Sequence, residues 1–417
     1  MRRLATEPEL AAVRGVVGRG RLRMDAWIVG GALRDRALGR AVSEIDLAVS
    51  GDAEAVARAL QSLGFGRAFL LSADRSPRVF RVAGRRRLLD VAEIEGASID
   101  SDLARRDFTV NALAFDLASG RLLDPFGGLA DLERRRLAMV SEANLADDPL
   151  RCLRAARLAA THGLVPDPRT SGACRRVAPT LARVARERIQ AELAKLLEVR
   201  QAAPALGWAW RAGVLEPAID LPIPAPAWRR LERRIAVTDT VPLAALPGAR
   251  RRRLRLALIG AGLEMAPAQA AAWLRRLRWS SEEASEVARL LELSSAARAP
   301  LTDDEEWLWI LRAGAQAGDA LRLAATLAPR SRRAVRRLAA RLRRKRPLPD
   351  VRGGDILEWL GLPPGPGIGR LLEAVRVEGL AGRVRTRAEA RRWLQVRVKQ
   401  GSTVSLRART GSGDAAL

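Results

Sequence analysis

The chain has 417 residues, too many for a single hydrophobic core to be the default, so about two to four structural units are expected. Hydrophobic residues make up 48% of it, yet no apolar stretch approaches the roughly 20 residues of a membrane helix, so we expect a soluble protein with no membrane partner. The formal net charge of +26 far exceeds what solubility requires and indicates a polyanionic partner, nucleic acid first of all.

The N-terminus and the rare residue types narrow the compartment and the chemistry. The start, MRRLATEPEL, lacks the apolar core and cleavage site of a secretory signal, so a cytoplasmic protein is expected. Cys152 and Cys174 are too few for a disulfide framework or a zinc site and are expected to be buried thiols. The single histidine, His162, excludes chemistry that needs a histidine pair, including that of metal-dependent phosphohydrolase domains.

From Asp25 to about Leu123 the chain mixes strand and helix patterns. Short apolar runs predict strands, and apolar residues at helical spacing that stop at Gly64 predict a helix. The strands are expected at 26–29, 45–49 and 88–91, and the helix at 53–63. This part of the chain is therefore expected to be an α/β or α+β unit.

From about Leu129 onward strand patterns nearly vanish. Segments 150–160 and 189–197 carry apolar residues at helical spacing among Arg and Glu, which predicts amphipathic helices. Prolines and glycines divide this helical part into several bundles or pairs. The last stretch, 401–417, is small and polar and is expected to be disordered.

A predicted strand that runs into paired glycines and a helix is able to hold phosphate. The segment WIVGGALRD places Gly30 and Gly31 at the turn and Arg34 one turn into the helix. Glycines let backbone amides approach an anion at the positive end of a helix, and a guanidinium adds a fork of charged donors. By itself this string is weak evidence, and a plain strand-to-helix turn is the better interpretation of it alone.

Two carboxylates follow on the next predicted strand. Glu44 and Asp46 alternate along it, so both side chains project from one face, where they can share divalent metal ions. Phosphoryl transfer to an RNA 3′ hydroxyl uses two metals, one to lower the pKa of the hydroxyl and one to hold the triphosphate and the leaving pyrophosphate. Asp90, in the strand at 88–91, is the natural third carboxylate. An acidic pair alone is more often a solvent-facing pattern.

Five ordered blocks carry a resemblance that the single motifs lack. The string GGALRDRALGRAVSEIDLAV resembles the head signature of class II CCA-adding enzymes and bacterial poly(A) polymerases. Four further blocks follow in the family's order: DLARRDFTVNALAFD (102–116), LLDPFGGLADL (122–132), DDPLRCLRAARLAA (147–160) and RERIQAELAKLL (186–197). A chance match of five ordered blocks is not credible.

The resemblance implies roles for the catalytic and phosphate-binding positions. Glu44 and Asp46 would bind magnesium, with Asp90 as a third ligand or base, for in-line attack of an RNA 3′ hydroxyl on the α-phosphate. The residues that would contact the triphosphate and ribose are Gly30, Gly31 and Arg34 in the first block, and Arg106, Asp107 and Asn111 in the second.

The 147–160 block is implied to select the base. Asp148 and Arg151 would present a Watson–Crick-like edge to the incoming nucleotide, so that side chains serve as the template, and Arg154 and Arg157 would support that edge and the phosphates. From the residues alone, Arg151, Arg154 and, less closely, Arg157 fall on neighbouring positions of one helix face. There they would repel one another without an anion or a carboxylate nearby.

The resemblance also implies the architecture. We expect an α+β nucleotidyltransferase head with a mixed β-sheet and flanking helices, followed by an all-α neck, body and tail. The expected boundaries are 1–130 for the head, 131–200 for the neck with its base-recognition helix, 201–400 for an RNA-binding body and tail, and 401–417 for a disordered end. Basic runs at 250–253, 332–337 and 341–346 are able to follow an RNA backbone by charge. Most of the tryptophans of this half are expected to pack in the core, with stacking on RNA bases as the alternative; they include Trp307, Trp309, Trp359 and Trp393.

The sequence departs from the family at the metal pair, which is usually Asp-x-Asp. Glu44 makes one ligand a methylene longer, and the octahedral geometry of magnesium is strict. A catalytically weakened relative that only binds RNA is therefore one alternative.

A second departure concerns the segment before the 102–116 block. Only VAEIEGASIDS separates Asp90 from Asp102, where CCA-adding enzymes commonly have a flexible loop associated with the switch from C to A addition. The predicted function is template-independent addition of CMP and AMP, from CTP and ATP, to a tRNA 3′ end, as a CCA- or CC-adding enzyme. Poly(A) polymerase is the other alternative, and nucleotide preference and oligomeric state stay open.

Overall fold

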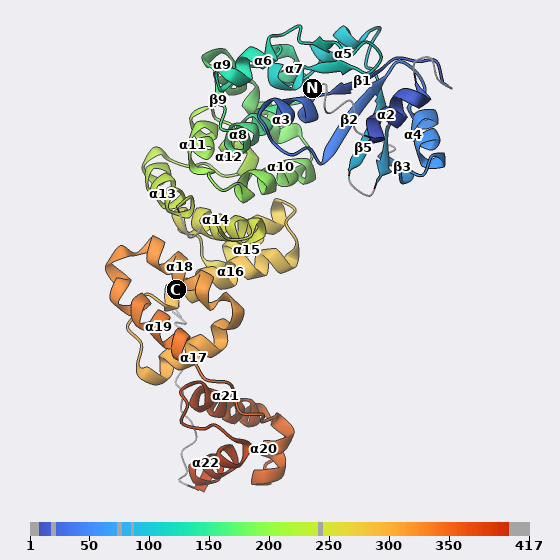
Figure 1. Cartoon of the computed structure of the whole chain (residues 1–417). Helices are drawn as coiled ribbons and strands as arrows, with labels where there is room; N and C mark the ends of the chain where they lie inside the picture. Colours follow the sequence, from blue (N-terminus) through green and yellow to red (C-terminus); the bar gives the residue numbers. More distant parts are fainter. Residues whose placement is uncertain (1–7, 18–21, 73–76, 85–86, 241–244, 400–417) are drawn as a thin grey trace. The chain divides into compact units, whose positions relative to one another are not determined.

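The computed structural model describes residues 8–17, 22–72, 77–84, 87–240 and 245–399. Its contacts divide the chain into two compact units, Met1–Arg252 and Arg253–Leu417 (Figure 1). The predicted disordered end at 401–417 lies outside the described residues. None of the helices in the described ranges is long and apolar enough to cross a membrane.

A seven-stranded mixed sheet lies at the centre of the N-terminal half of the first unit. Its strand order is β3-β4-β5-β2-β1-β6-β7, and all neighbours are antiparallel except β2 and β5. The strands are β1 (Ala26–Val29), β2 (Glu44–Val49), β3 (Arg67–Ser72), β4 (Val79–Ala83), β5 (Leu88–Glu93), β6 (Ala114–Asp116) and β7 (Leu122–Leu123). The three predicted strands are confirmed, whereas β3, β4, β6 and β7 were not predicted.

One face of the sheet is covered by α4 (Ala53–Ser62), which packs against β3, β4 and β5, with α2 (Pro8–Val16) packed on α4. The Asp52 side chain caps α4 by accepting a hydrogen bond from the Ala55 amide at 3.0 Å. The helix buries Val56 and Leu60 at helical spacing, so the predicted helix at 53–63 is confirmed.

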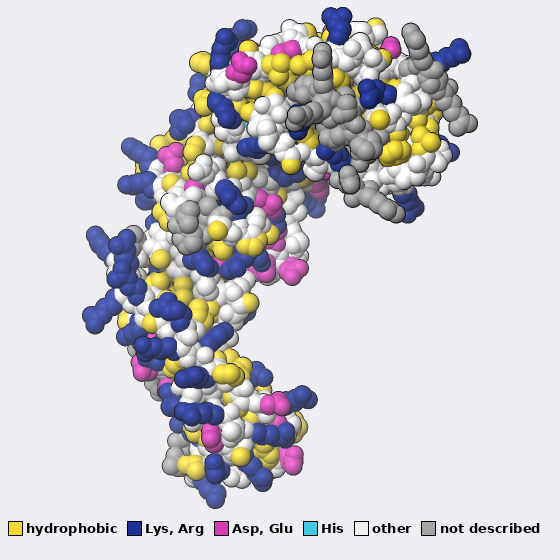
Figure 2. Space-filling view, viewed as in Figure 1, with side chains coloured by type: hydrophobic (Ala, Val, Ile, Leu, Met, Phe, Trp, Pro, Cys, Tyr) yellow, Lys and Arg dark blue, Asp and Glu magenta, His cyan; other side chains and the backbone are white. Residues whose placement is uncertain are grey.

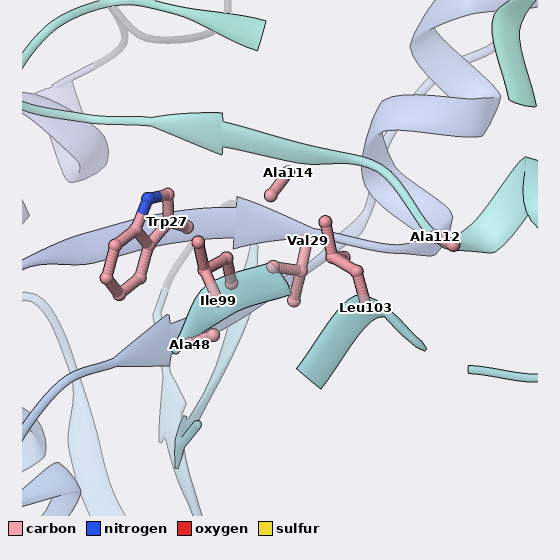
Figure 3. Close-up of a cluster of buried hydrophobic side chains, with 7 residues drawn as sticks. All are labelled: Trp27, Val29, Ala48, Ile99, Leu103, Ala112 and Ala114. Atoms are coloured by element: carbon pink, nitrogen blue, oxygen red, sulfur yellow. The ribbon is translucent and has the colours of Figure 1, made fainter. Parts of the chain in front are cut away.

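The other face is only partly covered. In Figure 3, Ile99 and Leu103 of α5 (Ile99–Ala104) lie over Trp27, Val29 and Ala48 of β1 and β2, and together they form a buried apolar cluster. Further along the same face, Glu44 and Asp46 are exposed. The apolar cluster thus anchors α5 on the sheet next to an open region that carries the two carboxylates.

The rest of the first unit is mainly helical. Its elements are α3 (Gly31–Ala37), η1 (Thr109–Asn111), α6 (Gly128–Glu133), α7 (Glu142–Asp147), α8 (Leu150–His162), α9 (Pro168–Val177), η2 (Ala178–Arg183), α10 (Arg186–Glu198), α11 (Ala203–Arg211), α12 (Leu215–Ile219) and α13 (Ala225–Thr238). The helices predicted at 150–160 and 189–197 are confirmed as parts of α8 and α10. A short parallel pair, β8 (Arg136–Leu137) with β9 (Val165–Pro166), was not predicted. Cys152 and Cys174 are buried, as predicted.

The second unit is helical throughout its described residues, as predicted. After α14 (Gly248–Gly262), which crosses the boundary between the units, come α15 (Pro267–Arg276), α16 (Ser281–Ala296), α17 (Asp303–Ala313), α18 (Ala317–Leu327), α19 (Arg332–Arg344), α20 (Gly353–Leu360), α21 (Pro366–Leu380) and α22 (Arg387–Lys399). Trp307 and Trp309 are buried, so core packing is confirmed for them. The last three helices share a small core that includes Ile356 and Leu394.

Basic side chains are scattered over the visible surface of both units (Figure 2). Part of the predicted basic run on α19 also serves the fold, because Arg337 and Arg341 both form ion pairs with the buried carboxylate of Glu306. Burying a carboxylate without such partners would be costly, so these two arginines stabilise the packing of α19 on α17.

Candidate active site

Three charged side chains form a row across the centre of the sheet. Asp46 on β2 is the register partner of Asp90 on β5, and Asp90 is the register partner of Arg81 on β4. Side chains of directly paired residues lie on the same face of a sheet, and Glu44 joins them from two residues earlier on β2. The three predicted carboxylates therefore share one face, together with an arginine that sequence reasoning did not single out.

The carboxylates in this row repel one another. The pKa of Asp46 is raised above its ordinary value, first by partial desolvation and then by the negative charges of Asp90 and Glu44. Arg106 and Arg34 oppose the shift without cancelling it. A bound cation would relieve this repulsion.

The donor set suits a hard divalent cation in part. Among the described residues, no group of three or more Asp, Glu, His or Cys side chains is arranged to hold a metal ion by itself. Two exposed carboxylates, Glu44 and Asp46, are what the protein offers. Magnesium is usually held by one or two carboxylates and by substrate phosphates, so this pair fits a metal that arrives with a nucleotide.

The paired glycines lie against two guanidinium groups. Gly30 has φ +70°, and a Cβ there would lie 3.1 Å from Arg106 Nη1 and 3.7 Å from Asp46 Oδ2. At Gly31 a Cβ would lie 3.3 Å from Arg34 Nη2. A side chain at Gly30 would be strained and would fill the space between Arg106 and Asp46, so glycine keeps that space open.

A buried polar network connects the glycine turn to the helical part. Arg34 Nη1 donates to Asn111 Oδ1 at 2.5 Å, Asn111 Nδ2 donates to Asp107 Oδ1 at 2.9 Å, and Arg154 Nη1 donates to Asp107 Oδ2 at 3.0 Å. Burial alone would raise the pKa of Asp107, but Arg154 and the hydrogen bonds from Asn111 and the Phe108 amide outweigh it, and the pKa is lowered. The structure thus brings together four of the predicted nucleotide-binding residues.

Carboxylates separate the predicted arginines of α8. Arg154 pairs with Asp107, and Arg157 Nε donates to Glu192 of α10 at 2.5 Å. Glu192 is buried and was not singled out from the sequence, although it lies in the quoted 186–197 block. The repulsion expected along this helix face is therefore removed by two partners that come from different elements.

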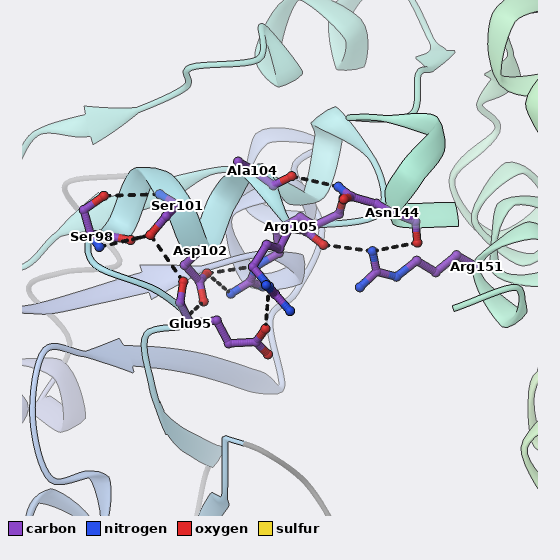
Figure 4. A network of polar contacts seen from close by, with 9 residues as sticks. Glu95, Ser98, Ser101, Asp102, Ala104, Arg105, Asn144 and Arg151 are labelled. Carbon is purple, nitrogen blue, oxygen red and sulfur yellow. Dashed lines mark hydrogen bonds and ion pairs between the residues drawn. The ribbon is translucent and has the colours of Figure 1, made fainter. Parts of the chain in front are cut away.

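Asp148 and Arg151, the predicted base-reading pair, have separate partners. Arg151 Nη1 donates to the backbone carbonyls of Arg105 at 2.8 Å and of Asn144 at 3.1 Å (Figure 4). Asp148 Oδ2 instead accepts from Arg188 of α10 at 2.8 Å. Asn144 and Arg188 were missed in the sequence because their roles depend on contacts between distant segments.

A cavity of about 630 Å³ lies beside Asp148. Asp147, Asp148 and Arg188 line it together with Arg176 and Arg183 of the neighbouring helices. Its size is within the range of cavities that hold small molecules. The cavity leaves polar groups of both charges accessible next to the predicted base-reading residue.

His162, the single histidine, allows a direct test of whether its surroundings are buried and positively charged as the structure shows. Nδ1 of His162 accepts a hydrogen bond from Arg40 Nη1 at 3.2 Å. Burial, together with the positive charges of Arg34, Arg40 and Arg157, lowers the pKa of His162 to about 3. We predict that the lone imidazole signal in an NMR titration of the folded protein stays unchanged from pH 8 down to about pH 4.

In urea the same signal should titrate near pH 6.5. Because the folded pKa is depressed, the stability that neutral His162 contributes is present above pH 6.5 and is lost as the pH falls toward 3. A folded-state transition near pH 6.5 would contradict this description of its surroundings.

Two regions of the chain match known families. Residues 26–138 match the "Poly A polymerase head domain", and residues 163–223 match the "Probable RNA and SrmB- binding site of polymerase A". The chain is 36% identical over 405 residues to the CC-adding tRNA nucleotidyltransferase of Geobacter sulfurreducens, which covers 88% of this chain and 91% of that protein. It is 31% identical over 396 residues to the CC-adding tRNA nucleotidyltransferase of Synechocystis sp.. That alignment covers 89% of this chain and 93% of the Synechocystis protein.

A solved structure shares the fold over almost the whole chain. The CCA-adding enzyme of Bacillus stearothermophilus, solved in complex with CTP, superposes with a TM-score of 0.72 at 27% identity and covers 95% of this chain and 99% of that one. The predicted α+β head followed by an all-α remainder is confirmed.

Proposed function

Because the chain belongs to the family of class II tRNA nucleotidyltransferases and bacterial poly(A) polymerases, we propose that it is a CC-adding tRNA nucleotidyltransferase. It would transfer CMP from CTP to the 3′ end of a tRNA twice, without a nucleic-acid template, and then stop. AMP addition from ATP would be left to a second enzyme. With tRNA as its substrate, the enzyme would act in the cytoplasm.

The short connection between β5 and α5 is the observation that supports CC addition over CCA addition. Only residues 94–98 lie between the two elements. Glu95, in this connection, is held by two residues that follow it. Its backbone amide donates to Asp102 Oδ1 at 3.1 Å, and its carboxylate accepts from Arg105 Nε at 2.8 Å (Figure 4). So short a segment, tied at both its backbone and its side chain, has no spare length for a loop that could move to admit ATP. The two relatives described above, named CC-adding, support the same choice.

The residues around the glycine turn would bind the triphosphate. Gly30 and Gly31 would let phosphate oxygens approach closely, and the guanidinium groups of Arg34 and Arg106 would donate to them. The buried contacts of Arg34 with Asn111 would keep it oriented before the nucleotide arrives.

Magnesium would be held by Glu44 and Asp46 and, when bound, would neutralise triphosphate charge and lower the pKa of the RNA 3′ hydroxyl. Desolvation is the main reason that the pKa of Asp46 is raised, and the negative charges of Asp90 and Glu44 raise it further. That repulsion supports this assignment, because a cation would relieve it. Asp90 stays a candidate for a third ligand or base.

Base selection would fall to Asp148 and Arg151, with Arg154 and Arg157 behind them. To read a base, Asp148 would give up its contact with Arg188 and bind the edge of the cytosine. Alternatively, Arg151 would give up its contacts with the backbone carbonyls to do so. The cavity beside Asp148 provides room for a nucleotide or for the RNA end.

In the proposed domain organisation, residues 1–130 form the head, 131–200 the neck and 201–400 the RNA-binding body and tail.

The test is nucleotide incorporation by the purified protein with magnesium. The substrates are tRNA transcripts that end before the CCA, after C and after CC, each with CTP, ATP or both. We expect two C residues and then a halt, with or without ATP. Completion to CCA would refute CC specificity, open-ended A addition would favour poly(A) polymerase, and no addition would favour an RNA-binding relative weakened by Glu44.

A further inference from the structure

Arg81 holds both oxygens of Asp90. Its Nε donates to Oδ1 and its Nη2 to Oδ2, each at 2.7 Å, and the two side chains are 23% and 15% exposed. A bidentate pair between a guanidinium and a carboxylate is among the stronger hydrogen-bonded ion pairs of proteins, more so when it is partly shielded from water. Asp90 is thus already neutralised by a cation of the protein itself.

The register of the sheet places this ion pair beside the carboxylates proposed to bind metal. Arg81, Asp90 and Asp46 are successive register partners on β4, β5 and β2. The negative charges of Glu44 and Asp46, after the hydrogen bonds and charge of Asp90, also raise the pKa of Arg81. A divalent cation that bound Asp90 here would stand next to a guanidinium, and the two positive charges would repel.

We propose that Arg81 is a positioning residue that competes with the divalent metal for Asp90. In the nucleotide-free enzyme it keeps Asp90 out of the metal site, so that a cation has only Glu44 and Asp46 as protein ligands until a nucleotide arrives. The triphosphate is the anion able to draw Arg81 away, after which Asp90 is free to act on the metal or the RNA end. This inference rests on the proposed function, because it takes Glu44 and Asp46 as the metal-binding pair.

Mn²⁺ binding to the nucleotide-free protein, followed by the EPR signal of free Mn²⁺, tests the proposal without RNA or catalysis. Arg81→Gln is expected to bind Mn²⁺ about tenfold more tightly than wild type, because a positive charge beside the site is removed and Asp90 is released. Asp90→Asn alone should change the affinity less than about twofold, since Arg81 already occupies that carboxylate. The double variant should lose most of the gain.

Arg78→Gln is the matched control. Arg78 lies three residues before Arg81 in the sequence, with its guanidinium 5.7 Å from the Phe80 ring centre, so its removal changes the net charge equally while the Arg81–Asp90 ion pair stays in place. Its Mn²⁺ affinity should stay within about twofold of wild type. Arg81→Lys, which keeps the charge but not the bidentate fork, should be intermediate. It also serves if Arg81→Gln does not fold.

With a CTP analogue that cannot react, the difference between wild type and Arg81→Gln should shrink to less than about threefold, and Asp90→Asn should now weaken Mn²⁺ binding. Unchanged or weaker Mn²⁺ binding by Arg81→Gln, including no binding by either protein, would overturn the proposal. Failure of CC addition would not affect this measurement, since it contains no RNA, so the two failures are distinguishable.

Discussion

Replacing Asp46 by asparagine is expected to lower the rate of CMP incorporation by about three orders of magnitude or more. Asp46 is the carboxylate at the centre of the row, between Glu44 on its own strand and Asp90 on the next. Its loss would remove one of the two exposed carboxylates proposed to bind metal. Metal stabilisation of transition-state charge is worth several kcal/mol, where about 1.4 kcal/mol is a factor of ten. The measurement is single-turnover incorporation of CMP into a tRNA that lacks its CCA end.

The same substitution should leave the metal-free protein at least as stable as wild type. The folded-state pKa of Asp46 is raised, so its ionisation opposes folding above that pKa and costs nothing at low pH, where the carboxyl is protonated. A gain in the thermal midpoint of Asp46→Asn should therefore be seen at pH 7 to 8 and vanish in acid.

Asp52→Asn is the matched control for Asp46→Asn. Asp52 caps α4, where asparagine is an equally good cap, so both activity and stability should be retained. Equal loss of activity in the two variants would refute the metal-binding role, as would an Asp46→Asn enzyme that retains a tenth or more of its rate.

Replacing Asp107 by asparagine is expected to destabilise the first unit by about 3 kcal/mol. Asp107 is 4% exposed and pairs with the partly buried Arg154 while accepting hydrogen bonds from Asn111 and the Phe108 amide. Removing one charge of a buried pair costs on the order of 3–5 kcal/mol. The lower end is expected here, because the asparagine keeps part of the hydrogen bonding and Glu192 Oε1 still lies 3.9 Å from Arg154 Nε. Thermal or urea unfolding measures the effect, and CTP affinity should fall with it.

Glu142→Gln provides the comparison for an exposed pair. Glu142 accepts two hydrogen bonds from Arg176, at 2.7 and 2.6 Å, but both side chains are largely exposed and screened by water, so its loss should leave the unfolding midpoint nearly unchanged. The lowered pKa of Asp107 means that its contribution is present above its unfolded value near 3.9 and is lost only as the pH falls further. Similar midpoints for the two variants would show that the Asp107 network is not essential to the fold.

Much of this site was predictable because its signals are local. Alternation along 43–47 predicted that Glu44 and Asp46 share a face, and β2 shows that pattern of exposed and buried residues. The helix at 53–63 follows from apolar spacing, a capping aspartate and a terminal glycine, all of which act within a few residues. Each of these features needs only the neighbouring sequence to form.

The strands β3 and β4 were missed for a physical reason. Phe69 to Leu71 on the edge strand β3 are all apolar and more than a third exposed, so β3 lacks the apolar alternation of a half-buried strand. In β4 the buried Phe80 and Val82 do alternate with Arg81, but the strand has only five residues. Pairing with β5 stabilises β4, and that pairing joins two separate segments of the chain. Arg81 was missed with it.

By itself, the sequence determined the family, the strand carrying the two exposed carboxylates, the glycine turn beside them and the amphipathic helices of the neck. Only the tertiary structure decided which charges neutralise one another. Arg154 finds Asp107 across 47 residues, and Arg157 finds Glu192 across 35. The physical reason is that an ion pair depends on strand register and helix packing, which place distant side chains within 3 Å, whereas spacing along the chain controls only which side chains share a face.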